Sequence, residues 1–340
     1  MLARLLTPLR LASAALVVLV AALVILLTQG SDRYLEVPDA AHPLTKLVRV
    51  PGSDARKDSG GIYYVDVLLK RASLLESLVP ALRPDGSDLI KRSDILEPGI
   101  SEKERFKIEI ADMKLSQVTA SAVALRALGY RVPVLFVGLK VLAVTSDSHA
   151  VGMLKPGDII VSADGRPVRD RSDLRAVLAG HLVGDVVRIA VRRGNELRTY
   201  AIRTTSDAAE PRQPIIGVLP TQKLNVKFPF RIRFDLGDVG GPSAGLAFAL
   251  ELLEKRGRDV DHGYKVAATG ELQLNGSVTR IGGVKQKTIG ARQANVDVFL
   301  VPVDGDNARE AKRYAHGLRI IPVESFQQAL RALATLPRKA

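Results

Sequence analysis

Residues 240–250 read GGPSAGLAFAL, a serine placed between glycines directly before an apolar run that predicts a helix. The small neighbours of Ser243 leave its hydroxyl accessible, and the free N–H groups at the start of a helix can stabilise an oxyanion. This arrangement suits a catalytic nucleophile. Because a serine after a glycine-rich turn is also a common helix N-cap, the stretch alone leaves both interpretations open.

A second stretch, GGVKQKTIGA at residues 282–291, predicts another helix, with two lysines in its first turn. Lysine is unexpected there because the helix dipole disfavours cations at a helix start. Helical spacing puts Lys287 on the face of Val284 and Ala291, whereas Lys285 points elsewhere. Lys287 can therefore face an apolar interior, where desolvation lowers the pKa of its amine, as a lysine general base requires. The alternative is a solvated basic helix start or an anion site.

Together with TGEL at residues 269–272, these stretches resemble the proteolytic domain of the Lon family of serine proteases, over residues 215–334. The resemblance implies that Ser243 is the nucleophile and that Lys287, 44 residues later, is the base. It implies peptide-bond hydrolysis through an acyl-enzyme, without a cofactor or a metal ion. The residues that it implies for the oxyanion site and for orienting the lysine are Gly240, Gly241 and Thr269.

Two features depart from the family pattern. The position three before the nucleophile, acidic in many Lon enzymes, is Gly240, and the nearest upstream carboxylate is Asp238. No GxxxxGK[ST] phosphate loop occurs, so we expect hydrolysis that does not depend on ATP. A Ser–His–Asp triad using His262 is a rival, although a loop histidine is the simpler interpretation. Metal catalysis has little support because no HxxxH or glutamate-rich cluster occurs.

Upstream, residues 148–160 read SHAVGMLKPGDII and are followed by an Asp-Gly hairpin turn at 164–165. This layout resembles a PDZ domain of the bacterial type over residues 138–204. A PDZ domain implies peptide capture, because a peptide strand adds to a sheet edge and amides of a glycine-containing loop hold its terminal carboxylate. An ordinary turn glycine at 138 is the alternative. The residues that we assign to this loop are Val137, Gly138 and Leu139.

The N-terminal segment predicts a membrane span. Residues 11–27 carry no charge and would form a helix of about 26 Å, at the short end of what crosses a bilayer. Arg4 and Arg10 precede the segment and no acidic residue comes before Asp32, so the N-terminus is expected in the cytoplasm and the rest outside it. A cleaved signal peptide is the less favoured alternative, since TQG at 28–30 is a weak cleavage site.

The composition is that of a folded protein with basic character. The 340 residues are 46% hydrophobic and 25% charged, with a net charge of +13 and no cysteine. Wholesale disorder, disulfides, thiol nucleophiles and cysteine-ligated metals are thereby excluded. The positive charge permits anionic partners, but the basic residues alternate with acids and aromatics are 4%, which argues against nucleic acid. An anionic membrane surface is the second candidate.

The expected fold is an α+β multidomain chain with a transmembrane helix, a small β-rich PDZ-like domain and an α/β Lon-type domain. This order resembles the membrane-anchored PDZ–Lon-like proteases of bacteria, often called the YlbL family. The predicted parts are a cytoplasmic tip and anchor (1–31), a linker with a strand and helix region that packs on the body (32–130), the PDZ-like domain (131–206) and the Lon-like domain (207–340).

Local patterns predict a polar linker after the anchor, a turn at residues 52–61 and a break at Pro98 and Gly99. Ser172 is the expected N-cap of a short helix. The predicted strands include 47–50, 62–69, 132–137 and 140–144, and the predicted helices include 73–79, 102–128 and 172–178.

The resulting hypothesis is a single-pass membrane serine endopeptidase, with its catalytic domain outside the cytoplasm, that cleaves captured proteins or peptides. The alternative from a different class is a non-enzymatic membrane adaptor that binds protein C-termini. A third possibility is autoinhibition that a bound peptide tail relieves. A homo-oligomer is expected by analogy alone, because Lon-like domains form rings.

Overall fold

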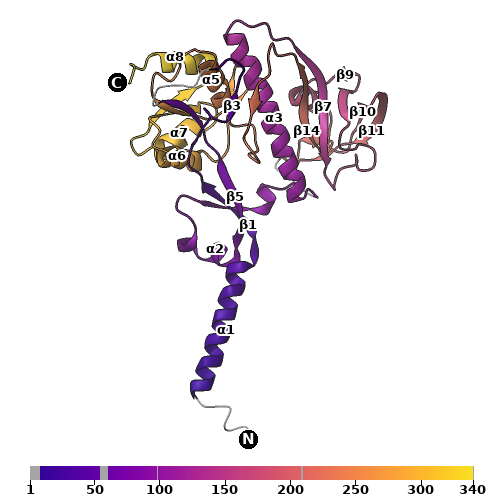
Figure 1. Ribbon diagram of the computed structural model, residues 1–340. Helices are drawn as coiled ribbons and strands as arrows, with labels where there is room; N and C mark the ends of the chain where they lie inside the picture. Colours follow the sequence, from indigo (N-terminus) through magenta and orange to yellow (C-terminus); the bar gives the residue numbers. More distant parts are fainter. Residues whose placement is uncertain (1–7, 54–59, 98, 208–209, 340) are drawn as a thin grey trace.

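The computed structural model describes residues 8–53, 60–97, 99–207 and 210–339. An isolated helix, α1 (Pro8–Thr28), leads into a mixed α+β body in which two sheets lie on either side of a long helix, α3 (Glu102–Ala127) (Figure 1). The predicted α+β multidomain organisation is confirmed. Arg4, the middle of the predicted turn at 52–61 and Pro98 lie outside the described residues.

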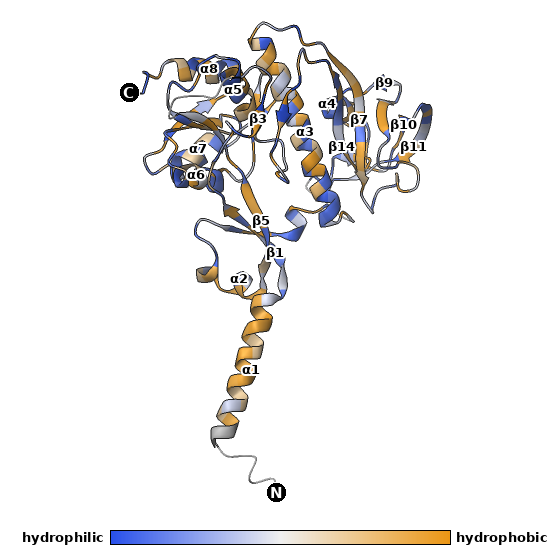
Figure 2. Ribbon diagram, viewed as in Figure 1, coloured by the Kyte–Doolittle hydropathy of each residue, from blue (hydrophilic) through white to orange (hydrophobic). Residues whose placement is uncertain are grey.

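Helix α1 is long and apolar enough to cross a membrane, and none of its apolar window, Leu11–Thr28, is buried in the rest of the chain. Figure 2 shows it as a nearly continuous apolar rod. Length and composition fit either a membrane anchor or a signal sequence.

The polar linker expected after α1 is instead a strand, β1 (Gly30–Pro38), which begins two residues after the helix. It is the middle strand of an antiparallel sheet, between β5 (Val67–Ser73) and β6 (Asp88–Lys91). Tyr34 and Leu35 are buried in this strand. Because charged residues stand next to these buried positions, the sequence predicted a linker where a half-buried strand lies. Helix α2 (Leu74–Leu78) follows β5 and starts at a capping box formed by Ser73 and Glu76.

The strand predicted at 62–69 is divided in two, because its halves join different sheets. β4 (Gly61–Tyr64) runs parallel to β16 (Lys265–Ala268), whereas β5 pairs with β1. The sheet that contains β16 has the order β2-β4-β16-β19-β20, and we refer to it as the Lon-like sheet. A segment before the PDZ-like part thus contributes to the C-terminal part of the molecule. The other strands of this sheet are β2 (His42–Pro43), β19 (Val298–Pro302) and β20 (Arg319–Val323).

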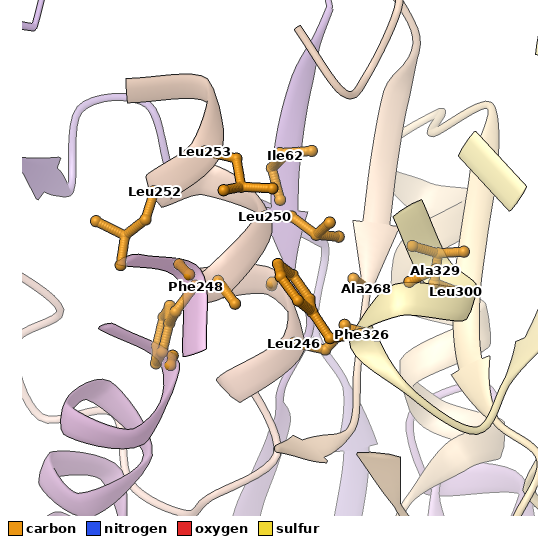
Figure 3. Packing of buried hydrophobic residues seen from close by; sticks show 14 of the residues in the cluster. Ile62, Leu246, Phe248, Leu250, Leu252, Leu253, Ala268, Leu300, Phe326 and Ala329 are labelled. Carbon is orange, nitrogen blue, oxygen red and sulfur yellow. The ribbon is translucent and has the colours of Figure 1, made fainter. Parts of the chain in front are cut away.

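Apolar helices cover the Lon-like sheet and form the main core. All five residues of β19 are buried, as expected for a parallel strand covered on both faces. Phe248 and Leu250 of the central helix α5 (Gly245–Lys255) pack with Ile62, Leu300 and Phe326 (Figure 3). The other helices of this region are α6 (Val284–Gln293), α7 (Asn307–Tyr314) and α8 (Phe326–Ala334).

The PDZ-like sheet has the order β11-β10-β8-β7-β14. Its edge strand β14 was not predicted, and it lies beyond the expected boundary at residue 207, yet it pairs along the whole of β7. The two strands expected at 132–137 and 140–144 are the single strand β7, because Gly138 (φ 134°) sits at a bulge and does not end it. The strands are β7 (Val134–Val144), β8 (Ile159–Ala163), β10 (Val186–Arg193), β11 (Glu196–Arg203) and β14 (Val218–Val226).

Helix α4 (Arg171–Leu178) lies against this sheet, and its N-cap is Asp170 instead of the predicted Ser172. The Asp170 carboxylate accepts from the amide of Asp173, a stronger acceptor than the serine hydroxyl one residue into the helix. The remaining short elements are β3 (Val48–Arg49), η2 (Pro80–Leu82), η3 (Arg92–Asp94), β9 (Arg166–Pro167), β12 (Thr205–Ser206), β13 (Pro214–Ile215), β15 (Arg233–Phe234), β17 (Glu271–Leu272) and β18 (Val278–Thr279).

Helix α3 contacts both the Lon-like part and the PDZ-like sheet. It begins at a capping box of Ser101 and Glu104 and ends before Gly129, whose φ of 86° suits a helix C-terminus. Small buried residues, among them Ser116, Ala120 and Ala124, let it pack closely on α5, and its other side contacts β14. The long helix therefore packs between α5 and β14, a position that its sequence alone did not reveal.

Candidate active site

Ser243 and Lys287 lie next to each other at the N-terminal end of α5. The Lys287 amine donates a hydrogen bond of 2.9 Å to the Ser243 hydroxyl, and Lys287 is only 5% exposed. Ser243 stands two residues before α5, so its position suits a nucleophile at a helix N-terminus better than an N-cap. Lys287 lies in the first turn of α6, which begins after Gly283 in the left-handed region (φ 65°).

The loop that carries Ser243 is held from two sides. On one side, α3 binds it through the Glu109 carbonyl, which accepts from the Gly241 amide at 2.8 Å, and through the Ser116 hydroxyl, which donates to the Pro242 carbonyl at 2.9 Å. On the other side, the Ser243 carbonyl accepts from the Gly270 amide at 2.8 Å and from the Thr269 hydroxyl at 3.2 Å. The nucleophile is therefore fixed before a substrate binds.

Two residues predicted to assist the dyad make other contacts. The N–H group of Gly241 is occupied by Glu109, so it is not available to an oxyanion. The hydroxyl of Thr269 binds the backbone of Ser243, and so it positions the nucleophile instead of the lysine. The amides of Ser243 and Gly240 donate to no acceptor within the described part of the chain.

Burial controls the charge of the lysine. Desolvation lowers the pKa of the Lys287 amine to about 8, even though the negative charges of Asp66, Glu36 and Glu109 raise it in part. Burial in turn raises the pKa of each of these three carboxyl groups. At a pKa of about 8, roughly a tenth of the amine is neutral at pH 7, and this neutral form is what a general base needs.

These carboxylates were not found by sequence reasoning, which pointed to Asp238, an exposed residue. Glu36 lies on β1, Asp66 follows β4, and Glu109 is on α3, all outside the stretch that resembles Lon. Glu109 contacts the position where many Lon enzymes carry an acid, because a Cβ atom on Gly240 would lie 2.6 Å from the Cβ of Glu109.

The first lysine of the motif, Lys285, has a different role. The Lys285 amine donates to the Asp88 carboxylate at 2.6 Å, and the neighbouring Gln286 amide donates to the same carboxylate at 2.8 Å. Lys285 therefore fastens α6 to β6, and it points away from the dyad as helical spacing predicted. His262, the rival base, follows the opposite end of α5, in a loop where it has a φ of 53°.

The peptide-binding loop was predicted at the wrong place. Val137, Gly138 and Leu139 all lie inside β7, where Gly138 pairs with Lys223 and Leu139 pairs with Gln222 on one side and with Ile160 on the other. A Cβ atom on Gly138 would lie 2.3 Å from the Ile160 carbonyl oxygen, so this glycine permits close strand packing. These residues do not form a loop.

A loop with the expected geometry precedes β14 instead. The Ile216 carbonyl accepts from the Ser148 hydroxyl at 2.7 Å, and the Gly217 carbonyl accepts from the Thr145 amide at 2.9 Å. Both carbonyls are thus turned inward, while the amides of Ile216 and Gly217 donate to no acceptor in the described residues. The sequence signal, a glycine directly before a strand of alternating polarity, is present at 215–226 but is weak.

Two groups of side chains have the spacing of metal ligands. Asp39, His42 and Asp66 place one ligand atom each within 4.8 Å of one another, as do three acidic residues near the end of α5. Within the first group, His42 is 3.2 Å from Asp39 and stacks on Tyr64, so internal contacts account for its position. The acidic residues of the second group are Glu254, Asp259 and Asp261.

Comparison with known proteins agrees with this architecture. Residues 236–335 match the Lon protease (S16) C-terminal proteolytic domain, and residues 121–204 match the PDZ domain. Lon protease 2 of Bacillus subtilis is 30% identical over 156 residues, which cover 45% of this chain and 28% of that protein. The Lon protease of Clostridium beijerinckii is 39% identical over 103 residues, which cover 29% of this chain and 13% of that protein.

The chain therefore spans less than a third of the length of the curated relatives it matches. Among solved structures, the PDZ domain of an SdrC-like protein from Listeria innocua is 31% identical, with a TM-score of 0.24 over 25% of this chain and 96% of that one.

The matched regions define the class of protein: the chain carries a serine protease domain and a peptide-binding module behind an N-terminal apolar helix. The protease domain is of the Lon (S16) type and the module is a PDZ domain.

Proposed function

We propose that this chain is a membrane-anchored, ATP-independent serine endopeptidase that uses a Ser243–Lys287 dyad and captures its substrates through the PDZ domain. The observation that carries the proposal is the hydrogen bond of 2.9 Å between a buried lysine and the Ser243 hydroxyl. The absence of a GxxxxGK[ST] phosphate loop from the sequence supports independence from ATP.

The reaction follows from the geometry. The neutral amine of Lys287 accepts the hydroxyl proton as Ser243 attacks the substrate carbonyl, and the tetrahedral intermediate places its negative charge on the carbonyl oxygen. Lys287 then donates that proton to the leaving amine, which leaves an acyl-enzyme on Ser243. A water molecule, deprotonated by the same lysine, hydrolyses the acyl-enzyme and restores the dyad.

The oxyanion needs N–H donors that point at the oxygen of the substrate carbonyl. The amide of Ser243 is one such donor, and the amide of Gly240 is the second, since the amide of Gly241 is committed to Glu109. Glu109 and Ser116 hold the loop in the shape that directs these donors. Helix α3 is accordingly part of the support for catalysis.

The PDZ domain supplies capture at the open side of β14. β14 is the last strand in the order of its sheet, so its outer edge can pair with a peptide strand, while the amides of Ile216 and Gly217 bind the peptide's terminal carboxylate. Helix α4 flanks the same edge, where the Arg171 guanidinium donates to the Pro220 carbonyl at 3.0 Å. Peptide tails would replace this contact when they bind.

Helix α1 serves as the anchor, with its N-terminus in the cytoplasm and the catalytic domain outside it. Strand β1 begins two residues after the helix and reaches the catalytic centre, and this direct connection supports an uncleaved anchor over a signal peptide.

The decisive experiment is labelling with a fluorophosphonate probe, followed by an assay on an unstructured protein without ATP. The wild type should be labelled and should cleave, and Ser243→Ala should do neither while retaining its circular dichroism spectrum and melting temperature. A Ser162→Ala variant, which changes a serine of the PDZ sheet, is the control for nonspecific labelling. Equal labelling of wild type and Ser243→Ala would favour the non-enzymatic adaptor.

A further inference from the structure

The helical hairpin formed by α2 and η2, residues 74–82, lies beside the end of α1 (Figure 1). Its first residue is fastened to the anchor, because the Leu74 amide donates to the Gln29 carbonyl at 2.9 Å and the Gln29 amide donates to Ile25 at 2.9 Å. Leu26 is half-buried although its neighbours along α1 are exposed. The hairpin is therefore level with the last apolar turn of α1.

The tip of this hairpin is apolar and uncovered. Leu78 is 69% exposed, Leu82 is 52% exposed and Val79 between them is also exposed. No residue of α2 or η2 is buried in the described structure. Single exposed apolar residues are ordinary, but several on one short hairpin, next to an exposed apolar helix, call for an explanation.

The hairpin is held in a fixed shape and carries cations near its base. The Arg83 guanidinium donates to the carbonyls of Glu76 and Ser77, at 2.8 and 3.0 Å, and so ties the end of the hairpin back onto α2. Lys70 and Arg71, on the adjoining strand, are exposed. Residues 70–85 contain these three cations and two acids, Glu76 and Asp85, so the segment has a net charge of +1, a sign that suits anionic headgroups.

The length of the anchor favours contact between this hairpin and the bilayer. The uncharged part of α1, from Leu11 to Thr28, would span about 27 Å, slightly less than the roughly 30 Å of a typical hydrocarbon core. A short span is accommodated by thinning of the bilayer or by drawing its flanks inward. The flank that would be drawn inward carries Leu78 and Leu82.

We propose that residues 74–82 are a second membrane contact, whose apolar tip enters the interfacial region of the bilayer beside α1 while Lys70, Arg71 and Arg83 face anionic headgroups. This inference rests on the proposed anchoring by α1. Two contacts fix the orientation of the protease, which a single helix leaves free to rotate. Since β1 rises about 3.3 Å per residue, Glu36, one of the acids that act on Lys287, lies no more than about 26 Å from Thr28.

The test uses the full chain in vesicles of phosphatidylcholine and phosphatidylglycerol, a fraction of them carrying a nitroxide on the acyl chain. Because the sequence has no cysteine, single variants Leu78→Cys and Leu82→Cys take one fluorophore each. Matched controls are Asp32→Cys, exposed near the same end of α1, and Leu197→Cys, 70% exposed on the PDZ domain. Quenching at 78 and 82 should exceed quenching at 32 and 197 severalfold.

Quenching at 78 and 82 equal to that at 32 would overturn the inference. An attached fluorophore can insert into the bilayer by itself, so a further variant combines Leu82→Asp with the label at residue 78. If the apolar tip enters the bilayer, the charge at residue 82 should clearly reduce quenching of this label. Unchanged quenching would overturn the inference. Flotation with the vesicles reports anchoring by α1 separately, and cleavage of a soluble peptide reports the dyad. A chain that floats and cleaves without quenching at 78 disproves only the second contact.

Discussion

The proposed catalytic centre and the proposed peptide-binding edge of the PDZ domain differ in what they are made of. At the catalytic centre, one side chain from the loop before α5 and one buried side chain from α6 form a hydrogen bond. At the PDZ edge, the proposed binding groups are the backbone amides of Ile216 and Gly217 and the outer edge of β14, and side chains such as Ser148 only hold the backbone in shape. The first site depends on the identity of two residues, and the second depends on the course of the main chain.

Helix α3 connects the two sites physically. Glu109 and Ser116 bind the nucleophile loop, while Asp112, three residues after Glu109, accepts from the Thr221 hydroxyl of β14 at 3.2 Å and lies 3.6 Å from the Arg171 guanidinium. The difference between the sites therefore has a clear experimental form: changes to side chains should abolish catalysis, and changes to the backbone should reduce capture.

The largest effect is expected at the lysine itself. Lys287→Met keeps the volume of the side chain but removes the base, so kcat/KM should fall at least about 10³-fold with little change in KM. Lys285→Met is the matched control on the same helix, because it removes only the contact with Asp88. Comparable losses in both variants would show that the motif stabilises α6 and does not select a base.

A backbone change at the catalytic centre should have the next largest effect. A methyl group at Gly240 would lie 2.6 Å from the Cβ of Glu109, so Gly240→Ala must displace α3 or the nucleophile loop. A misplacement of about 1 Å is expected to lower kcat about 10²-fold. The control is Gly237→Ala in the same loop, where a Cβ would meet nothing within 4 Å, and an equal loss of kcat there would argue against the contact with α3.

At the PDZ edge, Gly217→Ala should weaken capture and spare chemistry. Gly217 has a φ of 61° and a Cβ on it would lie 2.4 Å from the Cβ of Ser148, so the substitution should displace the two amides. Affinity for a C-terminal peptide should fall about tenfold, measured by fluorescence anisotropy, with kcat/KM for a short internal peptide unchanged.

The control for this prediction has the same backbone angle. Gly194 also has a φ of 61° but open space around it, so Gly194→Ala should cost only about 1 kcal/mol of local strain and leave peptide affinity unchanged. Weaker binding in both variants would point to general destabilisation of the PDZ sheet.

The same contrast explains what the sequence could predict. Ser243 and Lys287 lie in stretches whose residue types point to chemistry, and the motifs located the pair that the structure brings together. Gly138 and Gly217 are indistinguishable as letters, yet one sits at a bulge within β7 and the other forms a loop. A site made of backbone leaves little trace in residue types, and so the sequence did not show that Gly138 lies within a strand while Gly217 precedes one.

The pairing of strands that are distant in the chain could not be predicted from the sequence either. The apolar run at 62–69 gave no sign that β4 joins β16 while β5 joins β1, because periodicity reports burial and not the partner. For this reason the sequence did not predict that acids lie near Lys287, because Glu36 was assigned to a linker and Asp66 to the interior of one strand. Long helices, by contrast, were predicted nearly to the residue, as for α3.

The smallest expected effect concerns the acids and is seen in the pH profile. Activity should rise with pH through the pKa of the Lys287 amine, about 8, because only the neutral amine accepts the serine proton. The charge of Asp66 stabilises the protonated amine, so Asp66→Asn should lower this pKa and move the rise to lower pH. A shift of roughly 0.5 to 1 pH unit corresponds to a severalfold gain in kcat/KM at pH 7.

The matched control is Asp88→Asn, which removes a carboxylate that binds Lys285 and does not appear among the charges acting on Lys287. It should leave the position of the rise unchanged. A rise that stays in place in Asp66→Asn, or that moves equally in Asp88→Asn, would mean that another group controls the profile. Because the change is in charge alone, this comparison separates the electrostatics of the dyad from its geometry, which the substitutions at Lys287 and Gly240 test.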